Sequence, residues 1–283
     1  MASFTNTATL TYSGGQISSN TVTGELQELL TANKTATPSV YSPGDTVTYV
    51  VNLINAGAAP LNGLTVTDNL GAYPFNTSTL YPLGYVPGSV RYFVNGALQA
   101  APTVAAGPPL TVSGISVPAG GNAAIIYDAR LNAYAPPGAA GSVTNTAAVT
   151  GAGVTPPVTA QAVVTASAAA QPAITKAMSP SVVQEGSRLT YTFTVQNYGP
   201  TAITAADNVV ISDTFNPVLE PIAVTWNGTA WSPTANYTYN SSTGEFATVA
   251  GGVTVPAATV TQNADGTWAV TPGTGTLVVT GTV

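Results

Sequence analysis

The chain has 283 residues, of which 11 are acidic, 5 are basic and none is histidine or cysteine, giving a formal net charge of −6 at pH 7. The absence of Cys and His from the sequence excludes disulfides, thiolate metal sites and imidazole-based catalysis, so we expect no metal, no cofactor and no enzyme activity. So few basic residues provide no electrostatic footprint for nucleic acid. No apolar run is long enough to span a membrane, and the first residues do not resemble a signal peptide.

Glycine and proline divide the chain into short segments rich in Val, Thr, Ile and Tyr. This pattern is typical of an all-β protein, and no segment shows sustained helical periodicity. A run of small residues from Ala166 to Pro172 indicates a linker. We therefore expect an N-terminal hairpin in residues 1–29, a first Ig-like β-sandwich in residues 30–168 and a second in residues 169–283.

Two copies of one repeat follow each other along the chain. Lys34–Val40 matches Lys176–Val182 without a gap, and Val66–Asp68 matches Ile211–Asp213 after a three-residue insertion. The other matches are Gly44/Gly186, Tyr49/Tyr191, Asn55/Asn197, Val94–Gly96 with Trp226–Gly228, and Ile125–Tyr127 with Leu277–Val279. Asn55 and Asn197 each stand at the end of an expected strand, shortly before a glycine, which predicts a hairpin turn there.

The two copies differ at their ends. The first continues into Ser142–Thr150, a turn and a further strand from Val158 to Val164, whereas the second reaches Val283 without such a segment. A matching segment, Ser3–Thr11, stands at the start of the chain and is also followed by a turn and a strand. The final strands of one repeat therefore lie at the N-terminus, so the repeat is circularly permuted.

A sandwich without its last strands exposes a sheet edge and an apolar groove, and an isolated hairpin is only marginally stable. About five residues join the hairpin to Lys34 and span at most roughly 17 Å, which disfavours closure of one chain on itself. We therefore predict a head-to-tail homopolymer built by donor-strand addition. The donor residues are Phe4, Asn6, Ala8 and Leu10. The alternative is a fragment of a longer repeat protein, cut out of register.

Strand alternation places polar residues in the middle of apolar faces. These residues are Lys34, Asp68 and Asn145 in the first repeat, and Lys176 and Asp213 in the second, with Asn6 from the donor strand.

A desolvated lysine loses its proton and becomes a nucleophile, and a nearby carboxyl group can assist its attack on an asparagine carboxamide. The product is an isopeptide bond, with release of ammonia. We expect Lys34 to join Asn145 with help from Asp68, and Lys176 to join Asn6 of the next subunit with help from Asp213. The alternative is a buried Lys–Asp ion pair hydrogen-bonded to the Asn, without chemistry.

Five short motifs together resemble the bacterial surface repeat of unknown function numbered eleven in the DUF series. They lie in Lys34–Pro38, Gly44–Tyr49, Asn55–Gly57, Val66–Asp68 and Thr144–Ala147. This resemblance implies Ig-like sandwiches on the outside of a bacterium, usually in tandem arrays. The second copy departs from it because it has no Thr-Asn-Thr-Ala strand of its own. The Lys/Asp/Asn sets also resemble those that cross-link Gram-positive pilus and adhesin sandwiches.

Together these features predict the structural subunit of an extracellular fibre on a bacterial cell or spore surface. A weakly charged chain, with 6% charged residues, suits a protein that assembles. The alternative function is an adhesin or surface-layer stalk that binds a glycan or protein ligand through its aromatic loops. Only the fibre gives the permuted end strands a role.

Overall fold

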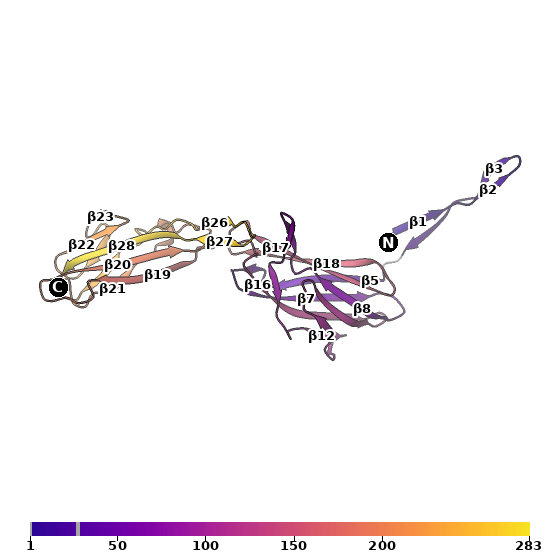
Figure 1. Ribbon diagram of the computed structural model, residues 1–283, viewed down its shortest axis with the longest axis horizontal. Coiled ribbons are helices and arrows are strands. Elements are labelled where there is room, and N and C mark those ends of the chain that lie inside the picture. The colour runs from indigo at the N-terminus through magenta and orange to yellow at the C-terminus, as the bar shows by residue number, and fades with distance from the viewer. Residues whose placement is uncertain (1, 27–28) are drawn as a thin grey trace.

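The computed structural model of the chain is an elongated row of two β-sandwiches with a thin hairpin at one end (Figure 1). It describes residues 2–26 and 29–283, with side chains described for residues 4–24 and 29–283. Within these residues there is no α-helix and a single 3-10 turn, Ala205–Asp207. The prediction of an all-β chain with two tandem sandwiches is therefore confirmed.

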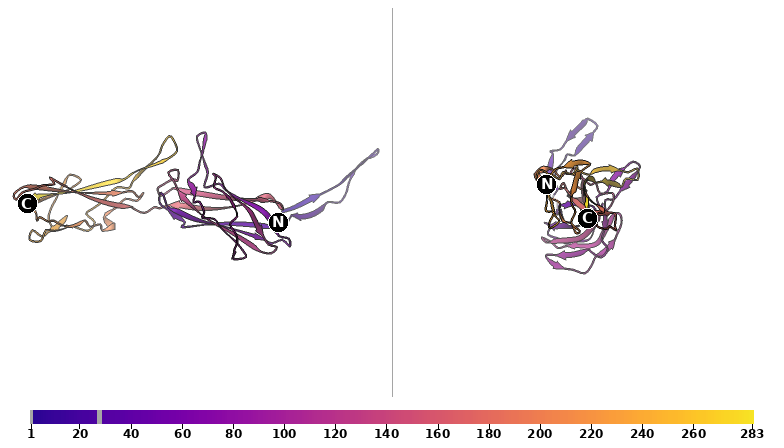
Figure 2. Two further views of the ribbon diagram at one scale, coloured as in Figure 1. Left: turned by 60° about the horizontal axis from the view of Figure 1, so that its bottom comes forward. Right: turned by 90° about the vertical axis from the view of Figure 1, so that its left-hand side faces the viewer.

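The N-terminal segment forms one long antiparallel hairpin that extends away from the first sandwich (Figure 2). Strand β1 (Ala2–Asn6) pairs with β4 (Val22–Leu26), and β2 (Thr9–Tyr12) pairs with β3 (Gly15–Ser18). The hairpin leaves large apolar side chains more than half exposed, namely Phe4, Leu10, Tyr12, Ile17 and Val22. A two-stranded ribbon with this surface gains stability only when another element covers it.

The first sandwich contains strands β5 to β18. Their bounds are β5 Leu30–Thr37, β6 Val40–Tyr41, β7 Thr46–Asn55, β8 Leu61–Asp68, β9 Tyr73–Phe75, β10 Ser78–Leu80, β11 Leu83–Tyr85, β12 Arg91–Val94, β13 Ala97–Leu98, β14 Thr103–Ala105, β15 Leu110–Val117, β16 Asn122–Leu131, β17 Ser142–Gly151 and β18 Val154–Ala166. One six-stranded sheet has the order β13-β12-β16-β7-β5, with β11 also paired to β16. The other has the order β14-β15-β8-β17-β18-β6.

The second sandwich contains strands β19 to β28. Their bounds are β19 Pro172–Ser179, β20 Arg188–Asn197, β21 Ser212–Thr214, β22 Ile222–Trp226, β23 Thr229–Trp231, β24 Tyr237–Tyr239, β25 Glu245–Thr248, β26 Thr259–Gln262, β27 Trp268–Thr271 and β28 Gly273–Thr282. Its larger sheet has the order β19-β20-β28-β22-β23, and its smaller sheet the order β21-β25-β24. Strands β26 and β27 form a separate hairpin.

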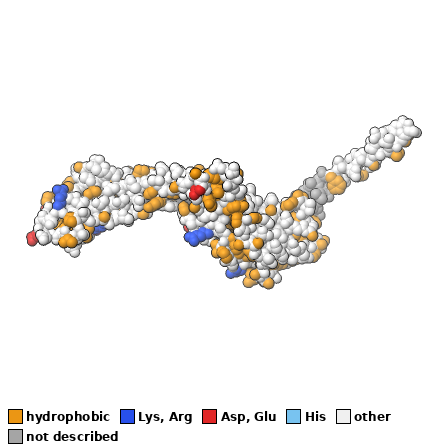
Figure 3. Space-filling model, in the orientation of Figure 1, with side chains coloured by type: hydrophobic (Ala, Val, Ile, Leu, Met, Phe, Trp, Pro, Cys, Tyr) orange, Lys and Arg blue, Asp and Glu red, His pale blue; other side chains and the backbone are white. Residues whose placement is uncertain are grey.

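Alternating side chains build the core of each sandwich. In β7, Val47, Tyr49, Val51 and Leu53 are fully buried, while the residues between them are half-buried or exposed. This period of two is the geometry of a strand with one face on the core. The surface carries few charged side chains, as Figure 3 shows for one face.

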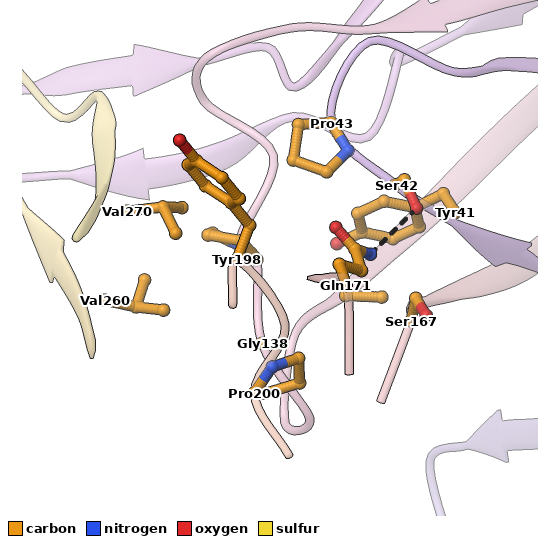
Figure 4. A pocket seen from close by; sticks show the side chains of 12 residues that line it. Tyr41, Ser42, Pro43, Gly138, Ser167, Gln171, Tyr198, Pro200, Val260 and Val270 are labelled. Carbon is orange, nitrogen blue, oxygen red and sulfur yellow. Dashed lines mark hydrogen bonds between the residues drawn. The ribbon is translucent and has the colours of Figure 1, made fainter. Parts of the chain in front are cut away.

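Contacts between the sandwiches hold them end to end. Residues 167–171 connect β18 to β19, and the β26–β27 hairpin reaches back so that the Trp268 N–H donates to the Ala133 carbonyl at 2.9 Å. Gln171 Nε2 also donates to Ser42 Oγ at 3.3 Å. A mostly apolar cavity of about 440 Å³ lies at this joint, with Tyr198 among its lining residues (Figure 4).

The predicted hairpin turns after Asn55 and Asn197 are wrong. Strand β7 pairs with β5 and β16, and β20 pairs with β19 and β28, so both edges of each strand are already occupied. The chain therefore crosses to the opposite sheet at these points. The Asn55 carboxamide supports this crossing: Nδ2 donates to the Ala59 carbonyl at 2.8 Å, and Oδ1 accepts the Gly57 N–H at 2.9 Å.

We predict that Asn55→Ala lowers the free energy of unfolding by about 2–4 kcal/mol, because it leaves buried backbone groups without partners. Urea denaturation measures the change. Asn33→Ala, an exposed position on β5, is the matched control and should stay within about 0.5 kcal/mol of the parent protein. Equal effects of the two substitutions would contradict a supporting role for Asn55.

Candidate functional site

Three polar residues meet in the core of the first sandwich. Lys34 lies in the middle of β5, Asp68 ends β8, and Asn145 lies in β17, so the two sheets face each other across this cluster. The exposed fractions of the Lys34 and Asp68 side chains are 0% and 2%, and Asn145 is 0% exposed. Such groups are costly to bury unless they bind each other.

The Asp68 carboxylate is the centre of this cluster. Both Lys34 Nζ and the Tyr127 hydroxyl donate hydrogen bonds to its Oδ2 atom. Its Oδ1 atom accepts the Leu70 backbone N–H at 2.9 Å. Both carboxylate oxygens therefore have hydrogen-bond donors, as buried polar atoms require.

Asn145 joins the cluster through the same tyrosine. Its Nδ2 atom donates to the Tyr127 hydroxyl at 3.3 Å, and its Oδ1 atom accepts the Gly71 backbone N–H at 3.2 Å. Lys34 and Asn145 thus meet the same Asp68–Tyr127 pair from two different strands.

Two stacked tyrosine rings enclose the lysine. The rings of Tyr49 and Tyr127 lie 5.6 Å apart, and Lys34 Nζ lies 4.8 Å from the centre of the Tyr49 ring. Burial lowers the pKa of Lys34 to about 8, against the opposing effects of Asp68. Burial also raises the pKa of Tyr127 well above its usual value, and Asp68 adds to the rise. A lysine with a lowered pKa is more readily converted to the neutral amine that acts as a nucleophile.

The second sandwich holds a more open version of this site. Lys176 Nζ donates to Asp213 Oδ2, and their side chains are 39% and 20% exposed. Lys176 Nζ lies 4.4 Å from the centre of the Tyr191 ring, which stacks on Phe215. The structure does not bring Asn6 to this pair, because Asn6 lies on the exposed N-terminal hairpin.

An open groove lies beside Lys176 and Asp213. It has a volume of about 370 Å³, and its lining includes Ile174, Phe193 and Ile211. All eight residues of β19 are exposed. Apolar side chains along this side are about half exposed or more, namely Ile174, Met178, Val182 and Val210. In the first sandwich, the corresponding side is covered by β17 and β18.

Sequence reasoning missed Tyr127, Tyr49 and Gly71 as parts of the site. In the alignment of the two repeats Tyr127 matches Val279, and this difference between a tyrosine and a valine is the one available signal. Gly71 contributes a backbone N–H from a loop, which no residue pattern could indicate.

In the described part of the chain, no three His, Cys, Asp or Glu residues cluster to hold a metal ion, and no helix is suited to cross a membrane.

No protein-family model matches the chain, and no curated protein matches its sequence. Among solved structures, BcpA, the major pilin subunit of Bacillus cereus, is 13% identical with a TM-score of 0.36, over 96% of this chain and 73% of that chain. The major pilin SpaD from Corynebacterium diphtheriae is 13% identical with a TM-score of 0.37, over 58% of this chain and 41% of that chain. A family 123 glycoside hydrolase from Clostridium perfringens is 11% identical with a TM-score of 0.33, over 49% of this chain and 27% of that chain. Likenesses at these scores carry no inference about function.

We predict that the free energy of unfolding of an Asn145→Ala variant rises with pH between about 8 and 10. This variant lacks the carboxamide that is expected to react with Lys34. The folded chain holds Lys34 with a pKa of about 8, below its ordinary 10.5, so in this range the unfolded chain binds more protons and loses them as the pH rises. The free energy of unfolding should increase by an amount on the order of 2 kcal/mol over this range, as measured by urea denaturation at each pH.

The control for this measurement is Asn145→Ala combined with Lys34→Met, which removes the titrating amine and should abolish the rise. A stability that is flat or falling over the same pH range in Asn145→Ala itself would contradict a buried lysine of lowered pKa.

Proposed function

We propose that the chain is the structural subunit of an extracellular bacterial fibre, in which the N-terminal hairpin of one subunit completes the second sandwich of the next. The observation that carries this proposal is a complementarity within one chain. A hairpin stands fully exposed at one end, and a sandwich without the matching hairpin stands at the other (Figure 1).

The N-terminal hairpin has the pairing pattern of β17 and β18. Val143 pairs with Val164 and Asn145 with Ala162 in the first sandwich. In the hairpin, Phe4 pairs with Gly24 and Asn6 with Val22, which are the corresponding pairs. The ring of Phe4 fills the space over Gly24, since a Cβ atom on Gly24 would lie 2.4 Å from Phe4 Cζ. One large residue and one glycine thus stand where the first sandwich has two valines.

The first sandwich supplies the register of the proposed contact. Ala147 lies opposite Asp68, and Ala148 lies opposite Thr67 on β8. Carried over to the second sandwich through the repeat, Ala8 lies opposite Asp213 and Thr9 opposite Ser212. This register places Asn6 at the same position relative to Lys176 and Asp213 that Asn145 has relative to Lys34 and Asp68.

Burial of the donor residues favours the contact energetically. Full burial of a side chain such as Phe4 or Leu10 contributes about 1.5–3 kcal/mol. Strand addition also supplies main-chain hydrogen bonds to the open edge beside β21. The hairpin extends from the end of the first sandwich that faces away from the second (Figure 2). A contact between such distant surfaces joins subunits head to tail and leads to an open filament.

In the proposed fibre, isopeptide bonds reinforce both sandwiches. Lys34 joins Asn145 within a subunit, and Lys176 joins Asn6 of the neighbour, each with release of one ammonia. The buried cluster of the first sandwich and the open Lys176–Asp213 pair support this part of the proposal. The family resemblance and a location on the bacterial cell or spore surface remain predictions.

We predict that two variants form a covalent bond with each other only between the hairpin of the first and the groove of the second. Lys176→Ala keeps a reactive hairpin but has no nucleophile in its groove, and Asn6→Ala has the nucleophile but an unreactive hairpin. Each alone should give only monomers on a boiled denaturing gel. Their mixture should give covalent dimers and nothing longer, with a mass short of the combined subunits by one further ammonia.

Electron microscopy of the parent protein separates the two parts of the proposal. Fibres without covalent dimers in the mixture would rule out the Lys176–Asn6 bond while leaving donor-strand assembly intact. A parent protein that forms no fibres, and whose behaviour is unchanged when residues 2–26 are deleted, would rule out the assembly itself.

The register can be tested directly, because the chain has no native cysteine. We predict that Thr9→Cys in one subunit forms a disulfide with Ser212→Cys in another under mild oxidation, read as a dimer on a non-reducing gel. Thr11→Cys with Ser212→Cys is the matched control. In the proposed register this pair is diagonal, at a Cα separation beyond the roughly 7 Å that a disulfide bridges. Preferential cross-linking of the control pair would contradict the register.

A further inference from the structure

Tyr127 lies between the Asp68 carboxylate, which is expected to assist the reaction, and the amide nitrogen of Asn145, which is expected to leave. Its hydroxyl donates to Asp68 Oδ2 and accepts from Asn145 Nδ2, which lies 3.3 Å away. Nδ2 is the atom that must depart as ammonia when Lys34 attacks the carboxamide. A departing amide nitrogen is a poor leaving group until it receives a proton.

The Gly71 backbone N–H fixes the orientation of the carboxamide. It donates to Asn145 Oδ1 at 3.2 Å and also to Asn69 Oδ1 at 3.0 Å, and in this orientation the amide nitrogen faces the Tyr127 hydroxyl. The same N–H points at the atom on which negative charge develops when an amine adds to the carboxamide carbon. This is the arrangement of an oxyanion-stabilising donor.

Asp68 has no direct route to the leaving nitrogen among the described contacts. Its Oδ1 atom accepts the Leu70 N–H, and its Oδ2 atom accepts Lys34 and Tyr127. The Tyr49 hydroxyl is also buried in this site and lies close to the Asn145 side chain, but its geometry does not meet that of a hydrogen bond. The hydrogen bonds that connect Asp68 to Asn145 Nδ2 therefore pass through Tyr127.

We propose that Tyr127 is a catalytic residue of the internal cross-link and relays a proton from Asp68 to the departing nitrogen of Asn145. This inference rests on the proposed Lys34–Asn145 bond. It concerns that bond alone, since the second repeat has Val279 at the matching position, opposite Tyr191.

The steps balance in protons and charge. The Lys34 ammonium gives one proton to Asp68, and the resulting amine forms a bond from Nζ to Cγ of Asn145. The Tyr127 hydroxyl then reverses its direction: it accepts the proton of Asp68 and donates its own to Nδ2. The Cγ–Nδ2 bond breaks, ammonia leaves, and the new amide nitrogen returns its surplus proton to Asp68. Tyr127 ends as it began.

The experiment compares Tyr127→Phe with Tyr49→Phe, because both remove one buried hydroxyl from the same pair of stacked rings. Each full-length chain is made by cell-free translation, sampled over time, quenched in acid and weighed by intact mass spectrometry. Tyr127→Phe should slow the loss of ammonia at least about tenfold, since general acid–base catalysis contributes roughly 10²–10⁴-fold. Tyr49→Phe keeps the ring beside Lys34 and should slow the reaction much less than Tyr127→Phe. Lys34→Ala sets the baseline without reaction.

Equal rates for Tyr127→Phe and the parent, or equal slowing by both variants, would overturn the relay while leaving the internal bond in place. A parent chain that never loses ammonia would overturn the bond itself and the relay with it. Should Tyr127→Phe not fold, the parent chain provides the second measurement. The rate of ammonia loss, plotted against the deuterium content of H₂O–D₂O mixtures, should follow a curve, because two protons move together in the relay. A straight line would overturn the relay.

Discussion

The open edge of a β-sheet is the constraint on which the rest of this structure depends. In the first sandwich, β17 pairs with β8 and β18 covers the next position, so the core beneath them is closed. In the second sandwich, the strand that matches part of β8 pairs only with β25, and the side toward β19 remains open. The groove and the partly exposed Lys176–Asp213 pair lie at this open side.

Much of the fold could be predicted from sequence because its signals are local or repeated. Alternation along strands placed Lys34, Asp68 and Asn145 on inward faces, and these residues are buried. Self-comparison identified the repeat, and the permutation of its end strands stays a prediction. The position of Tyr127 between Asp68 and Asn145 could not be predicted this way, since it depends on β16 lying opposite β8 and β17 across the core. The turn predicted after Asn55 failed for a similar reason: a local turn signal does not show that both neighbours of a strand are already in place.

The two Lys–Asp pairs show how burial changes the chemistry of one residue set. Lys34 is enclosed by tyrosine rings, and its pKa is lowered to about 8, whereas the Lys176 side chain is 39% exposed. Burial disfavours the charged form of an amine and so favours the neutral form that acts as a nucleophile. In the proposed fibre, the hairpin that carries Asn6 also covers Lys176 and Asp213. The arriving strand would then supply the carboxamide and remove the water, so that reaction at the second site follows correct assembly.

In the proposed fibre, this coupling would also account for the low charge of the chain. A groove that must accept a foreign hairpin needs apolar walls, and a hairpin that must enter it needs apolar side chains such as Phe4 and Leu10. Charged residues at either surface would keep the free subunit soluble but would have to be desolvated on assembly, which costs several kcal/mol for each unpaired charge. Two of the few charged residues, Lys176 and Asp213, instead line the groove, where they form an ion pair. The charged residues that the groove retains, Lys176 and Asp213, are thus the two that take part in the proposed cross-link.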